Sequence, residues 1–496
     1  MLQGKKSTKK WVTDETKTAN LGDARLNRRF GNVLEMLGRQ PTKSIPVASK
    51  GWHETKAAYR FFDYPQVTEE TVLQPHIDAT IERMRNEPII LLPQDTTELD
   101  YSDKPQTQGL GKLSYAKQLG MLLHPTLAMT PNRICLGIVS LEILIRKEFK
   151  RSSYLLYIIL FWIDESPSYE KLCLCLYFVK ALKKEALPIE KKESMRWLNS
   201  YRKAQELAEQ LPESKIVNIS DREGDLYEIF VEAQLAKGNS RAEFIIRGNY
   251  DRLLADTGEE KERKKLKKTV QISPVVSVIE FDLPQTKDRK ARRVTQEIRA
   301  ITVPLKSPKR VGIKLPSVTI NVIFAREVNA PHDVKPIEWM LLTSLPIDTA
   351  DRAIEIISWY LCRWQIEIFF KILKSGCEVE ELQLQTVDRL KPCIALYMIV
   401  TWRILYMTML GRNCSDMPCT AVFENEEWHA VYRVTYRRSP PKVPPDLNSM
   451  IKMIAGLGGF LNRKSDGFPG PKPIWIGLQR TRDFVIAMEA LDASRS

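Results

Sequence analysis

The chain has 496 residues, which exceeds one ordinary domain, so we expect two or three domains. Hydrophobic residues make up 43% of it, which is enough for a normal core and argues against a disordered chain. Its 75 Lys and Arg against 61 Asp and Glu give a net charge of +14, which predicts a partner rich in phosphate, such as a nucleic acid.

The first basic cluster of interest lies on a helix-like stretch near the N-terminus and contains Arg25, Arg28 and Arg29. A second short stretch, residues 57–61, contains Arg60. Other basic tracts lie between residues 261 and 310, where we expect solvated loops between strands, some of which need not touch a nucleic acid. The N-terminal arginines are therefore the better candidates for a binding surface.

Two apolar runs end in an aspartate. Residues 88–94 lead into Asp95, and residues 215–220 lead into Asp221. Each run predicts a short buried strand that delivers a carboxylate at its C-terminal end, where sheet proteins place active-site groups. Either aspartate taken alone could instead be an N-cap or a turn residue, which is the more common role.

The region after Asp221 is predicted to be mostly β. Alternating apolar and β-branched residues indicate strands at 244–247, 275–281, 298–303, 318–324 and 339–343. Arg247 ends the first of these strands, and such an arginine is ordinarily a surface residue. Trp339 begins the last strand, where a tryptophan ordinarily packs in a core.

Residues 360–374 contain no Gly or Pro and predict one continuous helix. At about 100° per residue, five polar side chains fall within an arc of roughly 80°. They are Tyr360, Arg363, Glu367, Lys371 and Lys374. A charged face is common on amphipathic helices, and Glu367 with Lys371 is an ordinary i,i+4 pair. With Asp95 and Asp221, however, Glu367 completes the three carboxylates of a two-Mg²⁺ site for phosphoryl transfer, because such hard cations prefer oxygen ligands.

Several other functions are disfavoured. There is no G-x4-G-K-[ST] loop, so we expect no nucleotide cofactor. The eight cysteines form no C-x2-C pair and the five histidines are scattered, which argues against structural zinc and favours a reducing, cytoplasmic setting. The Lys-rich N-terminus lacks the apolar segment of a signal peptide, and no apolar run is expected to approach the roughly 20 residues of a membrane helix.

At this point the chain resembles the DDE transposases of bacterial cut-and-paste insertion sequences, in the group typified by the transposase of transposon five. The Y-x2-R-x3-E-x6-K signature of that group is complete in Tyr360, Arg363, Glu367 and Lys374. The D-T-T context of Asp95, the D-R-E-x-D context of Asp221, the N-terminal stretches 21–29 and 57–61, and residues 457–460 are similar as well. The resemblance covers nearly the whole chain.

The resemblance implies an α/β fold with an RNase H-like catalytic core and a mostly β insertion at about 240–345. Asp95, Asp221 and Glu367 would then hold two Mg²⁺ ions, for which Mn²⁺ can substitute. Tyr360, Arg363 and Lys374 would contact the DNA backbone near the cleavage point, and Lys371 on the same stripe suits that backbone too. Trp339 would stack on a base flipped out of the duplex, and Arg247 would lie at the rim of the site.

The same resemblance implies a domain order and partners. Residues 1–70 would form a helical domain that recognises transposon ends through Arg25, Arg28, Arg29 and Arg60. Residues 71–395 would form the catalytic core, and residues 396–496 a helical dimerisation region. The expected partner is double-stranded DNA, both terminal inverted repeats and target, bound by a homodimer without any membrane.

One stretch departs from the family. Around residues 151–185, apolar runs replace a short polar connection. It is either a local insertion or a frame-shifted stretch in a decaying gene, and the lack of clear alternation or caps favours the second. Three functions therefore stay open: an active transposase, a catalytically inactive relic that binds transposon ends and represses transposition, and a metal-dependent nuclease. The complete set of signature residues favours the first.

Overall fold

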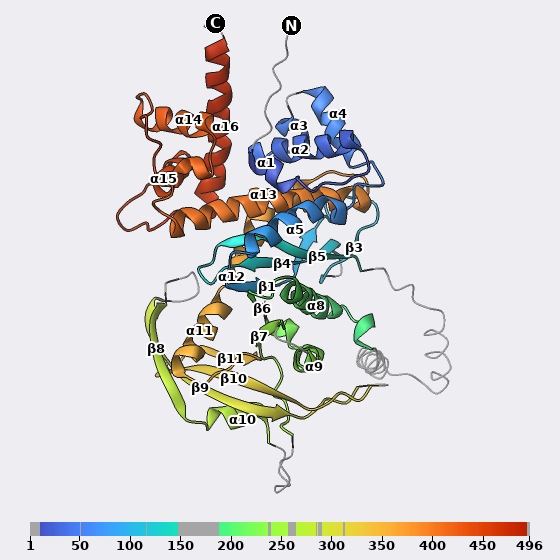
Figure 1. Ribbon diagram of the computed structural model, residues 1–496, viewed down its shortest axis with the longest axis vertical. Coiled ribbons are helices and arrows are strands. Elements are labelled where there is room, and N and C mark those ends of the chain that lie inside the picture. The colour runs from blue at the N-terminus through green and yellow to red at the C-terminus, as the bar shows by residue number, and fades with distance from the viewer. Residues whose placement is uncertain are drawn as a thin grey trace, which may run out of the picture. The chain divides into compact units, whose positions relative to one another are not determined.

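The computed structural model describes residues 10–49, 51–115, 117–146, 188–236, 240–255, 264–283, 285, 290–310 and 313–493 (Figure 1). The anomalous segment 151–185 lies outside the described residues. The chain divides into two compact units. The first unit comprises Met1–Ile90, Thr96–Arg146 and Trp364–Ser496, and the second comprises Leu91–Asp95 and Lys147–Arg363.

Five helices begin the first unit. They are α1 (Lys10–Glu15), α2 (Ala24–Arg39), α3 (Ile45–Ala48), α4 (Trp52–Phe61) and α5 (Glu69–Met84). Helix α2 begins after Asp23, whose side chain accepts a hydrogen bond from the backbone N–H of Arg25 at 2.6 Å and so caps the helix. Phe30 of α2 stacks on Phe61 of α4. The helical N-terminal region predicted from the sequence is confirmed.

The strands of the first unit gather around β4 (Leu119–Met129), which is buried along almost its whole length. It pairs antiparallel with β2 (Thr97–Asp100), β3 (Gly111–Lys112) and β5 (Cys135–Leu144). Gly120 of β4 faces the carbonyl of Leu99, and a Cβ at this position would lie 1.9 Å from that oxygen. This close strand pairing therefore requires glycine.

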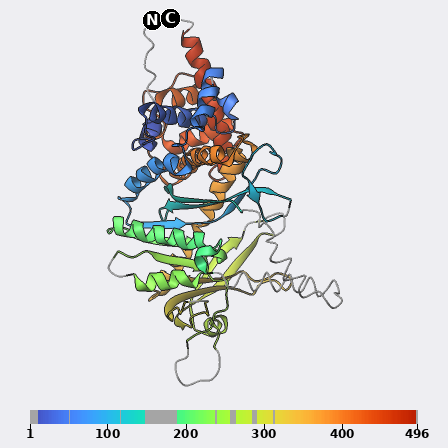
Figure 2. The same cartoon turned by 90° about the vertical axis from the view of Figure 1, so that its right-hand side faces the viewer.

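The second unit holds the end of β1 (Ile89–Pro93) and a mixed sheet. Strands β6 (Lys215–Ser220) and β7 (Glu243–Arg247) are parallel. From β7 the pairing continues antiparallel through β11 (Glu338–Thr343), β10 (Val318–Val328), β9 (Arg292–Leu305) and β8 (Val275–Leu283). Helix α8 (Met195–Gln210) packs on β6 and helix α9 (Tyr227–Leu235) on β10, both green in Figure 2. The remaining elements are η1 (Ile189–Lys191), η2 (Arg222–Gly224), α10 (Leu266–Gln271) and α11 (Ala350–Leu361).

These elements confirm the predicted fold class. The short buried strands before Asp95 and Asp221 are β1 and β6, and all five strands predicted after Asp221 are present. Apart from the short strands β2 and β3, the chain order β1, β4, β5, α8, β6, α9, β7, with an antiparallel β4–β5 pair and a parallel β6–β7 pair, is that of an RNase H-like core. The strands that follow form the mostly β insertion.

The single helix predicted for residues 360–374 is wrong. Helix α11 ends at Leu361, a turn occupies Cys362 and Arg363, α12 (Trp364–Lys371) follows, and the chain then widens into a π-helical turn, η3 (Ile372–Gly376). In the turn, the N–H groups of Cys362 and Arg363 bond to carbonyls three residues earlier instead of four. Tyr360 and Glu367 therefore lie on different helices, and the expected polar stripe is broken between them.

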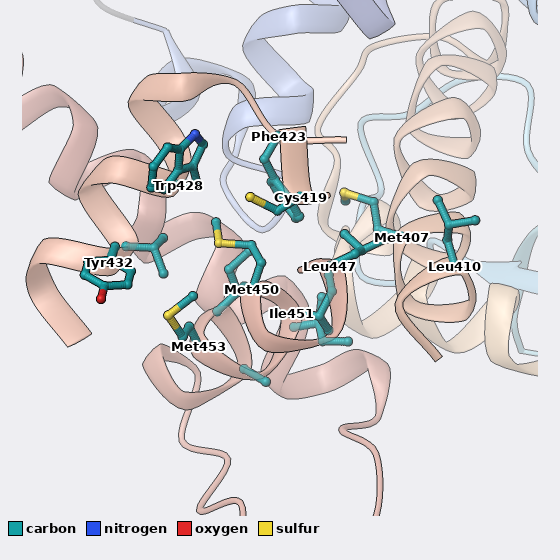
Figure 3. Close-up of a cluster of buried hydrophobic side chains, with 14 residues drawn as sticks. Met407, Leu410, Cys419, Phe423, Trp428, Tyr432, Leu447, Met450, Ile451 and Met453 are labelled. Carbon is teal, nitrogen blue, oxygen red and sulfur yellow. The ribbon is translucent and has the colours of Figure 1, made fainter. Parts of the chain in front are cut away.

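The C-terminal part of the first unit is helical. After η4 (Val379–Glu381) come α13 (Val387–Asn413), η5 (Cys419–Ala421), α14 (Asn425–Tyr436), α15 (Leu447–Leu457) and α16 (Pro471–Ala493). Buried side chains from α13, α14 and α15 meet in one cluster, in which Met450, Ile451 and Trp428 are labelled in Figure 3. Such a shared core indicates that these helices form one packed region.

The expectation that no apolar run approaches the length of a membrane helix is wrong for helix α13. Among the described residues it is the one helix long and apolar enough to cross a membrane, with a mean hydropathy of 1.6 over 18 residues. Of that window, 89% is buried inside the protein. Length and composition alone do not distinguish a membrane span from such a core helix.

Candidate active site

Asp95 and Asp221 follow the ends of strands that are hydrogen-bonded to each other. The backbone N–H of Gln94 donates to the carbonyl of Ile219 at 3.0 Å, and the buried Gln94 amide donates to the side chain of Asn218 at 2.8 Å. The two half-buried aspartates come directly after this bonded pair of strand ends. Asp221 also caps η2 by accepting a hydrogen bond from the N–H of Glu223 at 2.8 Å. The capping role weighed for this residue is therefore present alongside its strand-end position.

Arg363 holds the carboxylate of Asp95. Its Nη1 donates to Oδ2 of Asp95 at 2.7 Å, and the two side chains are 7% and 19% exposed. A charge-assisted bond so little exposed is stronger than a surface ion pair, because water screens it weakly. Since Arg363 lies in the turn that ends α11, this bond also gives a physical reason for the interruption of the predicted helix.

Three more of the predicted residues gather around Asp221 and Arg363. Tyr360 is buried, and its ring lies 6.4 Å from the half-buried ring of Trp339 at an angle of 57°. Burial raises the pKa of Tyr360, the nearby charges of Arg363 and Arg247 lower it, and Asp221 raises it further. The second unit thus brings together Asp95, Asp221, Arg247, Trp339, Tyr360 and Arg363.

The other predicted residues of this group belong to the first unit. Glu367, in the first turn of α12, and Lys371, at its end, are exposed. Lys374 lies in η3, and its Nζ is 3.4 Å from Oε1 of Glu380. Ile366, Phe369, Ile372 and Leu373 are fully buried, as predicted for the apolar side of this segment. The π-helical turn at Lys374 is a type of distortion that occurs frequently at functional sites.

The donor types suit a hard divalent cation. Asp95 and Asp221 present carboxylate oxygens at one pair of strand ends, and Glu367 presents a third carboxylate to solvent. These are the ligands that Mg²⁺ prefers. Across the described ranges, no three His, Cys, Asp or Glu side chains lie close enough together to form a ready-made metal group. Within the second unit, the guanidinium of Arg363 lies 2.7 Å from the carboxylate of Asp95.

Two acidic residues in this region were missed by the sequence analysis. The side chain of Asp225 is completely buried, accepts from the N–H groups of Asn249 and Tyr250 at 2.8 and 3.1 Å, and binds Arg252. It thereby fixes the loop after Arg247. Glu380 accepts a hydrogen bond from the N–H of Asp100 at 2.9 Å and pairs with Lys374. Only the D-R-E-x-D motif hinted at Asp225, and nothing in the sequence indicated Glu380.

The predicted N-terminal arginines lie on two helices. Arg25 and Arg28 are exposed and Arg29 is half-buried on α2, and all three line one cavity beside α4. Arg60 is exposed on the last turn of α4 and does not line this cavity. The structure thus gathers three of these four residues.

Both end regions of the chain match known protein families. Residues 8–67 match the family "Transposase DNA-binding", and residues 399–495 match the family "Transposase Tn5 dimerisation domain". Both ends of the chain are therefore similar to transposase domains. The predicted likeness to transposases is thereby confirmed in these two regions. The predicted catalytic residues Asp95, Asp221 and Glu367 lie between the two matched regions, in residues 68–398, so their roles stay predictions.

One solved structure is similar to the chain overall. It is described as a cryo-EM structure of the piggyBac transposase synaptic complex with hairpin DNA. The identity is 8%, the match covers 82% of this chain and 72% of that chain, and the TM-score is 0.32. A likeness at this level supports no conclusion about fold or function.

Proposed function

We propose that this protein is a transposase that cleaves DNA at the ends of a mobile element and joins them to target DNA by a cut-and-paste mechanism with a hairpin intermediate. The observation that carries the proposal is the group formed by Asp95, Asp221, Tyr360, Arg363 and Trp339 in a chain with transposase domains at both ends. Carboxylates, cations and an aromatic ring around one point are what phosphoryl transfer on DNA requires.

Asp95, Asp221 and Glu367 would hold two Mg²⁺ ions, for which Mn²⁺ can substitute. When bound, such ions activate the attacking hydroxyl or water and stabilise the leaving oxygen. Arg363, Tyr360 and the lysines Lys371 and Lys374 would bind the DNA backbone and orient the scissile phosphate.

Trp339 would receive a base extruded from the duplex, since its ring is only half-buried and Tyr360 packs on it. Arg247 would contribute charge at the rim. No covalent protein–DNA intermediate is needed.

The ends of the chain would supply recognition and assembly. Arg25, Arg28, Arg29 and Arg60 would bind the terminal inverted repeats, because three of them are exposed on α2 and α4, within the DNA-binding match. The C-terminal region would join two copies of the chain, as the dimerisation match suggests. We infer a DNA-bound homodimer that acts in the cytoplasm, without a membrane or a nucleotide cofactor.

The decisive experiment is metal-dependent nicking of a labelled duplex that carries the inverted repeat flanking this reading frame. Glu367→Ala is the control. It should keep binding the duplex, because an exposed carboxylate adds nothing to phosphate binding, and it should lose nicking. Nicking at the repeat boundary by the wild-type protein alone, in Mg²⁺ or Mn²⁺, supports the proposal.

A second candidate function is a catalytically inactive transposase relic that binds transposon ends and represses transposition. The apolar stretch at 151–185, which departs from the family pattern, favours it. Binding of the repeat duplex without nicking by either protein would establish this alternative. Nicking without preference for the repeat would instead favour a metal-dependent nuclease.

A further inference from the structure

A cavity of about 700 Å³ lies between α2, α4 and the C-terminal helix α16. Its charged lining consists of five arginines and two glutamates, namely Arg25, Arg28, Arg29, Arg39, Arg482, Glu35 and Glu54. Thr42, just after α2, donates a hydrogen bond to Gln479 of α16 at 2.6 Å, which ties the C-terminal helix to this wall. The cavity therefore joins the DNA-binding match to the dimerisation match with a clear excess of positive charge.

Arg482 is the unusual member of this lining. Its side chain is only 9% exposed, and within the described chain its guanidinium forms just a long ion pair, with Nη1 3.9 Å from Oε1 of Glu489, and donates no hydrogen bond. A buried arginine is ordinarily paired with a carboxylate or bonded to carbonyls, because leaving its five N–H groups unsatisfied is costly. This one lines the cavity instead.

A second arginine increases that cost. Arg39 pairs with Glu35, but its Nε is buried without a hydrogen-bond partner. Burial and then the charge of Arg39 lower the pKa of Arg482, while Glu489, Glu427 and Glu35 oppose this shift. Two guanidinium groups of like charge thus line one cavity, one with a buried N–H that lacks a partner and one with only a long ion pair, and an anion between them would relieve both.

We propose that Arg482 and Arg39 form a binding site for a phosphate oxyanion. The N–H groups of a guanidinium match the geometry of a phosphate and donate two parallel hydrogen bonds to its oxygens. The phosphate belongs either to the DNA backbone or to a free phosphate ion, since both present the same oxygens. If it belongs to DNA, the C-terminal helix takes part in binding the end that α2 recognises, and this branch rests on the proposed function.

The test uses the full chain as wild type, Arg482→Gln, Arg482→Lys and the matched control Arg480→Gln. Arg480 lies on the same helix but is exposed, donates to the carbonyl of Leu457 and does not line the cavity. One arm measures binding of the repeat duplex over a range of salt concentrations. The other measures the melting temperature against inorganic phosphate at constant ionic strength.

If a backbone phosphate occupies the site, Arg482→Gln weakens duplex binding roughly tenfold or more and lowers the slope of log affinity against log salt by about 0.9. Arg480→Gln changes neither quantity, and Arg482→Lys lies between. If free phosphate occupies the site, duplex binding is unchanged, but the phosphate-dependent rise in melting temperature is lost in Arg482→Gln.

The proposal is overturned if Arg482→Gln matches the wild type in both arms. In buffer without phosphate this variant should melt at or above the wild-type temperature, because it removes a charge that Arg39 repels. Should it fail to fold, Arg482→Lys keeps the charge and carries the same two measurements. Failure of the proposed function can be told apart from failure of this proposal. In that case the wild type would not bind the repeat duplex, while the melting temperature against phosphate would still test the site.

Discussion

Replacing Glu15 with Gln should loosen the attachment of the N-terminal helix α1 to the first unit. The carboxylate of Glu15 is 2% exposed and lies 2.5 Å from Nδ1 of His76 and 2.6 Å from Nη1 of Arg83. Nε2 of His76 accepts a hydrogen bond from the N–H of Ile138 at 3.1 Å, so the ring proton is on Nδ1 and is donated to Glu15. This network links α1, α5 and β5.

The size of the effect follows from burial. Breaking a buried ion pair by removing one charge costs about 3–5 kcal/mol. The side-chain oxygen of the introduced glutamine can still accept a hydrogen bond from either His76 or Arg83, while its NH₂ group faces the other donor. The side chain of Arg83 is 23% exposed, so water can solvate part of its charge. We therefore expect the lower end, about 3 kcal/mol, which corresponds to a roughly 100-fold loss of protection against local opening.

Hydrogen–deuterium exchange of the peptides that cover α1 and β5 measures this directly. Glu82→Gln is the matched control, because it makes the same substitution on α5 in an exposed pair with Arg85, where we expect about 0.5 kcal/mol or less. If both variants exchange at the same rate in α1 and β5, the view that Glu15 anchors the N-terminal helix is refuted.

Three other outcomes are expected. The Arg363→Gln variant should bind Mn²⁺ severalfold more tightly than the wild type, because the substitution removes a cation bonded to the predicted metal ligand Asp95. A titration followed by electron paramagnetic resonance measures this affinity, and weaker binding would contradict the prediction. The variant should also lose nicking. Burial lowers the pKa of His76, so the unfolded chain takes up a proton at a higher pH than the folded chain does. The free energy of unfolding should therefore fall as the pH drops below about 6.5, which urea titrations at several pH values measure. His76→Gln should lose that dependence. Glu380→Gln should raise duplex affinity by freeing Lys374, whereas Glu381→Gln, on the same turn but paired with Lys104, should not.

The strands and their terminal aspartates were predictable because the relevant signals are local. A short run of buried β-branched and aliphatic residues determines that β1 and β6 are strands, and the next residue is necessarily at the strand end. Their hydrogen bonding to each other was not encoded locally, since it depends on pairs such as Gln94 and Asn218, far apart in the chain. The sequence patterns therefore predicted Asp95 and Asp221 as candidate site residues but not the contacts between their strands.

The helix at 360–374 shows the opposite case. Every local signal favours a continuous helix, because no residue in it is Gly or Pro. The break at Cys362 and Arg363 coincides with the bond from Arg363 to Asp95. Helix propensities differ by less than about 1 kcal/mol per residue, whereas a hydrogen bond to a charged group contributes about 1.5–3 kcal/mol. A single long-range ion pair is thus enough to override the local preference.

The D-R-E-x-D segment shows why a motif does not by itself assign roles to its acids. Asp221 and Asp225 are four residues apart and chemically identical, yet their surroundings differ. Asp225 is completely buried, and its two oxygens accept three hydrogen bonds, from Arg252 and two backbone N–H groups, so its carboxylate is already engaged within the protein. Asp221 is half-buried and uses one oxygen to cap η2. Burial and hydrogen bonding, which only the folded chain defines, therefore make Asp225 structural and leave Asp221 as the acid suited to chemistry.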